Sequence, residues 1–292
     1  RKGFHITGTA GAFGATAGVA HLLGLSKVQT QMALGMTASM ASGVKAQFGT
    51  MAKPMHAGLA ACAGVDAVLW AKAGIVAAQD GLAEPQGFAA THNAECDDLA
   101  FEGLGQRYLL PEVSHKFHAC CHGTHAMLEA LQELKKTHKL TPKNIRSLQI
   151  FVHPQYLDIC NIHEPRTNLE AKFSFRQLAA MLLYGLPTNR LDSYTDAICS
   201  DGDIRDLRSR VTVQPDLALS ETSAKVVIQT TKGKYFSADH DFSRSLNLTA
   251  REQKVLSKSD SLIGKKHRIK LWSCIKREAE SDIRIGALLI LP

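Results

Sequence analysis

The feature that most constrains the fold is a run of small residues between positions 8 and 74, in which alanine and glycine recur at close spacing. The run divides into three expected helices, over residues 10–23, 28–42 and 54–74. Gly24 and Gly43 end the first two, Ser26 can cap the second, and Pro54 suits the first turn of the third. Because small side chains let helix axes approach closely, the run predicts a buried all-helical layer.

The chain changes character after about position 114, where large apolar residues replace the small ones. Met127, Leu128 and Leu131 recur at helical spacing and predict a helix over residues 124–136. Further expected elements are a strand over 145–152, a helix over 171–184, short strands over 211–213, 224–230 and 234–237 with a turn at 232–233, and a last helix capped by Thr249. Helices that alternate with short strands indicate an α+β unit.

The small-residue pattern before position 114 and the mixed helix and strand pattern after it predict a mainly α protein with a smaller α+β domain. We expect residues 1–113 to form part of a helical domain and residues 114–245 to form an α+β lid domain. Residues 246–292 are expected to be a C-terminal segment that returns to the helical domain. Because Arg1 opens directly into the small-residue run, we also expect further helices of the first domain upstream of it.

The chain carries a formal net charge of +7, from 34 Lys+Arg and 27 Asp+Glu. Basic residues gather between positions 254 and 270, which could form a nucleic-acid or acidic-membrane contact but is explained better by a solvated surface segment. No aromatic residues alternate with these charges as stacking platforms, so we expect no nucleic-acid partner. The longest apolar stretches fall short of the ~20 residues of a membrane span, so we expect no membrane partner either.

Seven cysteines, of which Cys120 and Cys121 are adjacent, do not form the evenly paired set of a secreted disulfide framework. Their odd number favours a reducing compartment. We therefore expect a cytoplasmic protein, or a mitochondrial one if the source is a eukaryote.

Glycines at positions 8, 11, 14 and 18 invite a dinucleotide-binding interpretation. Their spacing is G-x-x-G-x-x-G rather than G-x-G-x-x-G, and no strand is expected before them. Close packing of helices explains these glycines better, so no organic cofactor is expected here.

Residues 115–125 hold four histidines beside the two adjacent cysteines. Cys121 or His122 could join His125 as a short-spaced pair of zinc ligands. No second pair elsewhere completes a site of three or four ligands. Metal binding, ordinary packing at a loop–helix junction and a polar pocket wall around Lys116 therefore stay open as explanations.

Lys53 stands immediately before an expected helix start, in the segment Gln-Phe-Gly-Thr-Met-Ala-Lys-Pro-Met-His-Ala-Gly over 47–58. Backbone N–H groups point outward at a helix start and the helix dipole favours anions there. Lys53 would therefore suit a carboxylate, with His56 in the first turn, although a surface lysine fits the same pattern. His5, followed by Thr7, is ambiguous in the same way, between a core residue and a catalyst.

Three stretches together resemble the MmgE/PrpD family, the family of 2-methylcitrate dehydratase. Residues 3–11 (G-F-H-I-T-G-T-A-G) are similar to its G-[WF]-H-x-T-x-x-x-G opening, and residues 48–61 to its F-G-T-x-x-K-x-x-H-x-G-x-A-A signature. Residues 116–125 resemble its lysine followed by C-x-x-T-H, and residues 170–174 its E-A-[KR]-[FH]-S segment. The resemblance covers most of residues 1–245.

The resemblance implies a large all-helical domain with a smaller α+β lid, a homodimer, and no metal or organic cofactor. It implies a lyase or isomerase that acts on small di- or tricarboxylates, such as 2-methylcitrate dehydratase, cis-aconitate decarboxylase or an imino-dicarboxylate epimerase. The family's pocket positions fall on two groups of residues in this chain. They are His5, Lys53 and Lys116 as catalytic residues, and Thr7, His56 and His125 as substrate-binding residues.

One hypothesis for the mechanism follows from this set. Lys53 and Lys116 would clamp substrate carboxylates and stabilise negative charge that develops on the neighbouring carbon. His5 would then act as general acid or base. The hypothesis requires that positions 5, 53 and 116 converge in one positively charged cavity between two lobes.

The chain departs from the family pattern at two points. Gln177 stands three residues after Ser174, where the family usually has a tyrosine. The first third of a typical member, with a further pocket histidine, is also expected upstream of Arg1. A second hypothesis, a non-catalytic family member, therefore stands beside the enzyme.

Overall fold

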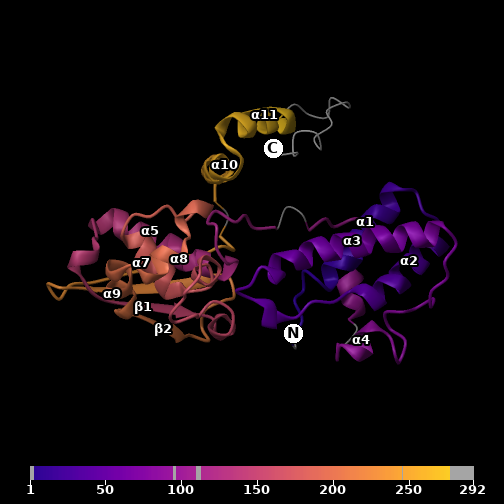
Figure 1. Ribbon diagram of the computed structural model, residues 1–292, viewed down its shortest axis with the longest axis horizontal. Helices are drawn as coiled ribbons and strands as arrows, with labels where there is room; N and C mark the ends of the chain where they lie inside the picture. Colours follow the sequence, from indigo (N-terminus) through magenta and orange to yellow (C-terminus); the bar gives the residue numbers. More distant parts are fainter. Residues whose placement is uncertain (1–2, 95–96, 110–112, 245, 277–292) are drawn as a thin grey trace. The chain divides into compact units, whose positions relative to one another are not determined.

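The computed structural model describes residues 3–94, 97–109, 113–244 and 246–276, and it divides into two compact units, Arg1–Pro111 and Glu112–Pro292 (Figure 1). The first unit is helical, and the second combines helices with a four-stranded sheet. This agrees with the expected mainly α protein that has an α+β part, although the α+β unit is the longer of the two in this chain. None of the described helices is long and apolar enough to cross a membrane.

Three helices of small residues, α1, α2 and α3, make up most of the first unit (Figure 1). They pack against one another, and α3 lies close to α1 at Gly64, where an added Cβ would lie 2.6 Å from the Cβ of Ala15. The described elements of this unit are α1 (Ala10–Leu22), α2 (Lys27–Met40), η1 (Lys45–Gln47), α3 (Ala52–Lys72), α4 (Phe88–Thr91) and η2 (Asp98–Phe101). The three expected helices are confirmed within two residues at each end.

Helix α2 begins as the sequence predicts, with Ser26 as its N-cap. The Ser26 hydroxyl accepts a hydrogen bond from the Gln29 backbone N–H at 3.3 Å, and the Gln29 side chain accepts one from the Ser26 N–H at 3.0 Å. This reciprocal capping box satisfies two N–H groups that the helix itself leaves without partners.

Two buried threonines join α1 to α2. The hydroxyl oxygens of Thr16 and Thr37 lie 2.7 Å apart. Thr16 Oγ1 also lies 2.9 Å from the Ala12 carbonyl oxygen, and Thr37 Oγ1 lies 2.8 Å from that of Ala33. Each threonine therefore contacts its own helix and the neighbouring one.

A four-stranded mixed sheet organises the second unit, with strand order β2-β1-β3-β4. β1 pairs in parallel with β2, so that Leu148 lies opposite Val211, whereas the pairs β1–β3 and β3–β4 are antiparallel. The strands are β1 (Ile145–Val152), β2 (Val211–Pro215), β3 (Ser223–Thr230) and β4 (Tyr235–Asp241). The helices are η4 (His122–Thr124), α5 (His125–His138), η5 (Pro142–Asn144), η6 (Pro154–Leu157), α6 (Asn168–Ala171), α7 (Phe175–Leu183), η7 (Leu191–Ser193), α8 (Asp196–Ser200), α9 (Gly202–Ser209), α10 (Leu248–Ile263) and α11 (Lys265–Lys276).

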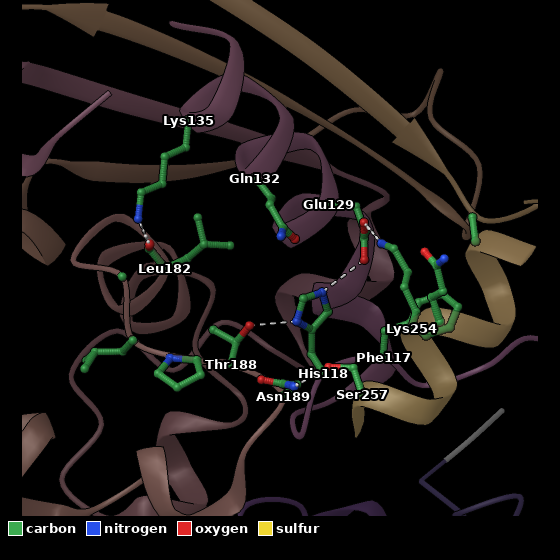
Figure 2. A pocket seen from close by; sticks show the side chains of 15 residues that line it. Phe117, His118, Glu129, Gln132, Lys135, Leu182, Thr188, Asn189, Lys254 and Ser257 are labelled. Atoms are coloured by element: carbon green, nitrogen blue, oxygen red, sulfur yellow. Dashed lines mark hydrogen bonds and ion pairs between the residues drawn. The ribbon is translucent and has the colours of Figure 1, made fainter. Parts of the chain in front are cut away.

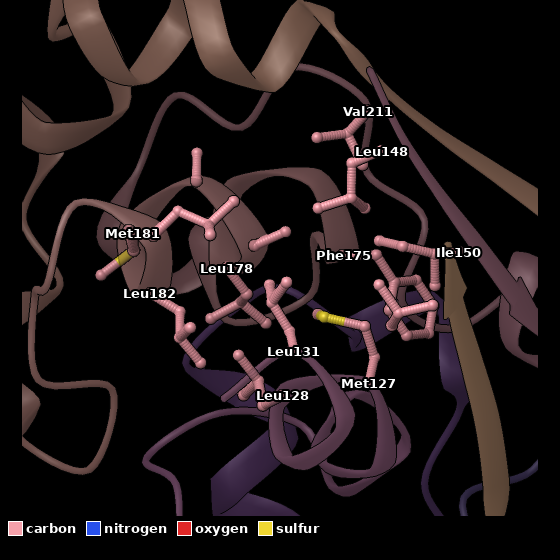
Figure 3. Close-up of a cluster of buried hydrophobic side chains, with 14 of the residues drawn as sticks. Met127, Leu128, Leu131, Leu148, Ile150, Phe175, Leu178, Met181, Leu182 and Val211 are labelled. Atoms are coloured by element: carbon pink, nitrogen blue, oxygen red, sulfur yellow. The ribbon is translucent and has the colours of Figure 1, made fainter. Parts of the chain in front are cut away.

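The core of the second unit lies where α5 and α7 meet the sheet (Figure 3). Leu148 and Ile150 alternate with more exposed residues along β1 and turn inward, as expected for a strand with one buried face. Leu131 from α5 and Phe175 from α7 are fully buried against them. Large aliphatic and aromatic side chains therefore fill this core.

Two expectations for this unit are wrong in detail. The helix expected over residues 171–184 begins only at Phe175, as α7, because the Ser174 side chain accepts a hydrogen bond from the Gln177 N–H and caps it, and the preceding helix α6 ends at Ala171. Helix α10 is capped by Asn247 rather than Thr249, because Asn247 Oδ1 accepts from the Ala250 N–H at 2.8 Å. Asparagine and threonine are both good N-caps, so the sequence alone did not separate them.

The basic C-terminal helices take part in contacts within the second unit. Lys254 of α10 forms an ion pair with Glu129 of α5, and Lys258 Nζ donates to the carbonyl oxygens of Lys116 and His118 at 2.7 and 3.0 Å. Part of the basic run is thus engaged in internal contacts. The expected return of the C-terminal segment to the helical domain, and a domain boundary at residue 245, stay predictions.

Candidate active site

Residues 3–5 are held near α3 by backbone pairing with the loop after α2. The His5 N–H donates to the Gly43 carbonyl oxygen at 3.0 Å, and the Lys45 N–H donates to that of Gly3 at 2.7 Å. Gly43 has a φ of 127°, and a Cβ there would lie 3.1–3.3 Å from ring atoms of His56. A glycine at this position therefore lets the loop lie against the His56 imidazole.

His5 and His56 form a hydrogen-bonded pair, with their Nδ1 atoms 2.9 Å apart. His56 projects from α3 and is buried, and His5 is half-buried beside it. One Nδ1–H donates and the other Nδ1 accepts, so the bond requires that at least one of the two imidazoles be neutral. Burial lowers the pKa of His5, and the nearby Lys53, His56 and Lys45 side chains lower it further. A neutral His5 is suited to accept a proton.

Lys53 lies beside this pair, on the first turn of α3. The prediction that it precedes the helix is wrong, because α3 already begins at Ala52. Its Nζ lies 4.9 Å from the centre of the Phe48 ring, and the His5 ring meets the same ring edge-on at 5.1 Å. We call His5, Phe48, Lys53 and His56 the His5 cluster.

Three of the six predicted pocket residues therefore meet in the first unit. Their sequence separation of about fifty residues is bridged by α1, α2 and the pairing of residues 3–5 with residues 43–45. Thr7 is exposed, and within the described part of the chain no side-chain contact joins it to the His5 cluster. Its predicted role in substrate binding stays a prediction.

In the second unit, His125 begins α5 and is fully buried. Within the described ranges, neither of its ring nitrogens has a hydrogen-bond partner. Its ring lies 5.0 Å from that of His118, 5.1 Å from that of His122 and 5.9 Å from that of Phe242. A buried imidazole without a partner is costly, which marks this position as a place where a polar ligand would be stabilised.

The surroundings of His125 are positively charged. Burial lowers the pKa of His125, and His118, His122, Lys116 and Lys258 lower it further. Burial also lowers the pKa of His122, with Lys116 and Lys258 as the next causes. Both imidazoles are therefore neutral near pH 7, and the fixed positive charge comes from the two lysines. We call Lys116, His122, His125 and Lys258 the Lys116 cluster.

Lys258 was not identified from the sequence. It lies in the basic run of the C-terminal helices, 142 residues from Lys116, and nothing local to it signals a role. The two predicted residues of this unit, Lys116 and His125, are close enough to interact electrostatically. The convergence of the Lys116 cluster with the His5 cluster stays a prediction, since each unit is described by itself.

The structure bears on two of the explanations for residues 115–125, metal binding and ordinary packing. Among the described residues, no group of three or more His, Cys, Asp or Glu side chains is placed to hold one metal ion. Burial raises the pKa of Cys120 to about 12, and its Sγ contacts Thr124 Oγ1 at 3.1 Å. Cys120 is therefore a protonated packing residue rather than a nucleophile.

A polar chain of side chains, also missed by the sequence analysis, lines a pocket of about 580 Å³ between α5, α10 and residues 185–189 (Figure 2). His118 contacts Thr188 Oγ1 through Nδ1 at 2.7 Å and Glu129 Oε1 through Nε2 at 3.3 Å, and Glu129 also binds Lys254. Burial alone would raise the pKa of Glu129, but the hydrogen bonds from His118 and Lys254 lower it to about 2. The ion pair between Glu129 and Lys254 at the end of this series of side chains therefore connects α5 to α10.

Comparison with known proteins supports the arrangement of the chain in two parts. Residues 1–97 match the MmgE/PrpD N-terminal domain, and residues 118–268 match the MmgE/PrpD C-terminal domain. The cis-aconitate decarboxylase of Homo sapiens is 27% identical over 221 residues, which are 73% of this chain and 45% of that protein. The chain thus spans less than half the length of this curated relative. With both domains matched in order, the chain belongs to the MmgE/PrpD family.

Proposed function

We propose that this chain carries carboxylate-binding and proton-transfer residues of a cofactor-independent lyase or isomerase that acts on small di- or tricarboxylates. The contact between His5 and His56 beside Lys53 carries the proposal, because it places a neutral base next to a fixed cation. The family supports a lyase of the dehydratase or decarboxylase type. A homodimer, as the resemblance implies, is part of the proposal.

The proposed chemistry addresses negative charge that develops on a carbon next to a carboxylate. Lys53 and Lys116 would bind substrate carboxylates and withdraw charge from that carbon, which lowers the barrier most where water is excluded. His125, whose buried nitrogens have no partner among the residues that the structure describes, would hydrogen-bond a substrate carboxylate. Thr7 would supply a further hydroxyl contact.

The His5–His56 bond suggests how the proton would be held. If His5 receives a proton at Nε2, its Nδ1–H can donate to His56 Nδ1 when that nitrogen carries no hydrogen, which stabilises the charged ring. His56 would thus act on the orientation and charge of His5 rather than on the substrate. This division of roles also explains why a buried histidine lies on the inner side of the pair.

A binding experiment tests the site without knowledge of the reaction. Citrate should raise the melting temperature of the chain, because a ligand that binds the folded state stabilises it. Lys53→Gln should abolish most of this shift, whereas Lys72→Gln, with the same charge change on the same helix, should keep it. Equal shifts in the two variants would contradict the assignment of Lys53.

A turnover experiment then separates the enzyme from a non-catalytic family member. Proton NMR of 2-methylcitrate, cis-aconitate and an imino-dicarboxylate would distinguish dehydration, decarboxylation and epimerisation, and His5→Asn should lower any turnover by ~10²-fold or more. The relative named as a cis-aconitate decarboxylase makes cis-aconitate the first substrate to try. Binding of citrate that depends on Lys53 without turnover of any of the three would favour the non-catalytic alternative.

A further inference from the structure

A second, separate cluster of cations lies on the second unit, around one face of α9. Arg205, Asp206 and Ser209 lie on this face together with Gly202, at the spacing of neighbouring helix turns, and line a pocket of about 460 Å³. Arg176 of α7 and Arg208 of α9 complete its cationic lining, with His163 and Glu164 from the segment after β1. None of these residues belongs to the His5 cluster or the Lys116 cluster.

Arg208 is the unusual member, because it is a buried cation bound to neutral groups. Its side chain is only 7% exposed, and NH1 donates to Gln177 Oε1 at 2.8 Å and to the Cys199 carbonyl oxygen at 3.2 Å. Within residues 113–244 and 246–276, no carboxylate forms an ion pair with it. Buried arginines are almost always paired with an anion, so this guanidinium is short of a counter-ion.

The other charges of the pocket do not supply that counter-ion. Arg176 NH1 donates to the neutral Asn161 Oδ1 at 2.5 Å, and Asp206 is already ion-paired with Arg210 outside the pocket. Burial lowers the pKa of Arg208, Glu164 opposes this effect, and the nearby charge of Arg205 adds to it. Among the described residues, three guanidinium groups and one carboxylate without an ion pair, that of Glu164, therefore line this pocket.

We propose that this pocket binds a phosphate group, with Arg208 and Arg205 as its principal ligands and Arg176 beside them. A phosphate dianion matches the two surplus positive charges, and its oxygens suit the paired N–H donors of guanidinium groups. A single carboxylate offers one charge and two oxygens and would leave the site under-compensated. The ligand is a phosphorylated small molecule or free phosphate, and the site is independent of the function proposed above.

Gln177 acquires a role in this proposal. It stands where the family usually has a tyrosine, and it is fully buried, with Nε2 donating to the Ile198 carbonyl oxygen at 3.2 Å and Oε1 accepting from Arg208. A neutral amide can hold Arg208 in place without neutralising it. The side chain at 177 thus positions the cation and leaves its charge for a ligand.

The first test uses inorganic phosphate and the full 292-residue chain, by calorimetry and by thermal unfolding, with sodium chloride at matched ionic strength as reference. Phosphate should bind and raise the melting temperature. Arg205→Gln should weaken binding by tenfold or more, since it removes a charged pair of donors. Arg244→Gln makes the same charge change at an exposed site outside the pocket and should leave binding unchanged. Equal phosphate affinity in these two variants, or a chloride effect as large as that of phosphate, would overturn the proposal.

The second test introduces a carboxylate next to Arg208 by substitution of a residue of the protein itself. Gln177→Glu should pair with Arg208, raise the melting temperature measured without phosphate, and weaken phosphate binding by tenfold or more. Phosphate binding as tight as in the unmodified chain would overturn the role of Arg208. Glycerol phosphate and citrate, compared with inorganic phosphate, distinguish the source of the anion. Tighter binding of glycerol phosphate or equal binding of the two phosphates supports a phosphate site, and tighter binding of citrate overturns the assignment to phosphate.

Discussion

The two units differ in what they bury. The buried clusters of the first unit consist mainly of alanine, with Met32 and Val68 as their largest members. The cluster of the second unit contains many leucine, isoleucine, phenylalanine and methionine side chains. At the same time α3 leaves large apolar residues such as Met55, Leu59 and Leu69 exposed. Since hydrophobic stabilisation scales with buried apolar area, the second unit gains more from its own core.

This difference teaches that the two units are sensitive to opposite changes. Helices of small residues lie so close together that the first unit has little room for added atoms, as the contact between Gly64 and Ala15 shows. A core of large side chains depends on every one of them to fill its volume, so the second unit is sensitive to lost atoms. The His5 cluster is thus positioned by close backbone approach, and the Lys116 cluster by a well-filled core.

The largest expected effect is the loss of volume in the second unit. Phe175→Ala should cost about 3–5 kcal/mol of unfolding free energy, because a fully buried ring is replaced by a cavity. Leu217→Ala removes an exposed side chain, and should change stability by no more than about 0.5 kcal/mol. Denaturant unfolding measures the change in free energy, and hydrogen exchange shows in which of the two units it occurs. Unchanged hydrogen-exchange protection of α5 and β1 in Phe175→Ala would contradict the view that the second unit depends on its large core side chains.

A gain of volume in the first unit should come next. Gly64→Ala places a Cβ within 2.6–2.8 Å of Ala15 and of the Thr16 backbone nitrogen, and should cost about 1–3 kcal/mol. Gly58→Ala, on the same helix but with nothing within 4 Å, should instead stabilise by about 0.5–1 kcal/mol. Melting temperatures of the pair measure the contrast. Similar effects of both substitutions would show that α1 and α3 are not closely packed.

The last expected effect concerns charge in the second unit and depends on pH. Glu129→Gln should cost about 2 kcal/mol at pH 7, since two charge-assisted hydrogen bonds are weakened. The folded-state pKa of about 2 lies below the ordinary value of 4.5, so this stabilisation is complete above pH 4.5 and is lost as the pH falls toward 2. Unfolding curves between pH 7 and 2 should therefore show the two proteins converging in acid. Glu133→Gln, exposed on the same helix, should show no such pH-dependent difference.

Much of the fold could be predicted because its signals are local. Strand β1 matches the expected residues 145–152, and the capping box at Ser26 starts α2 as expected. The start of α7 after Ser174 was missed because the apolar residues on both sides of this serine fit one helix, and only the hydrogen bond of its side chain marks it as an N-cap. The order β2-β1-β3-β4 depends on pairing between distant segments, which no local pattern contains.

The candidate site was predictable in part for the same reason. His5, Lys53 and His56 were found through the family motifs, and the contact between His5 and His56 joins two of them. Lys258 and the pair of Glu129 with Lys254 were missed, since each joins residues more than 120 positions apart without a motif. Arg208 was missed as well, because its burial and the lack of an ion-pair partner among the described residues are properties of the fold that a sequence does not report.

The junction between α1 and α2 has one further property. The side chains of Thr16 and Thr37 have two hydroxyl hydrogens between them. Their oxygens make three close contacts, one with each other, one with the Ala12 carbonyl oxygen and one with the Ala33 carbonyl oxygen. Either hydroxyl can point across the junction while the other points along its own helix, so two proton arrangements share the same heavy-atom positions. A valine in place of either threonine would leave one hydroxyl hydrogen at this junction. The hydrogen bond between the two side chains, and with it the second proton arrangement, would be lost.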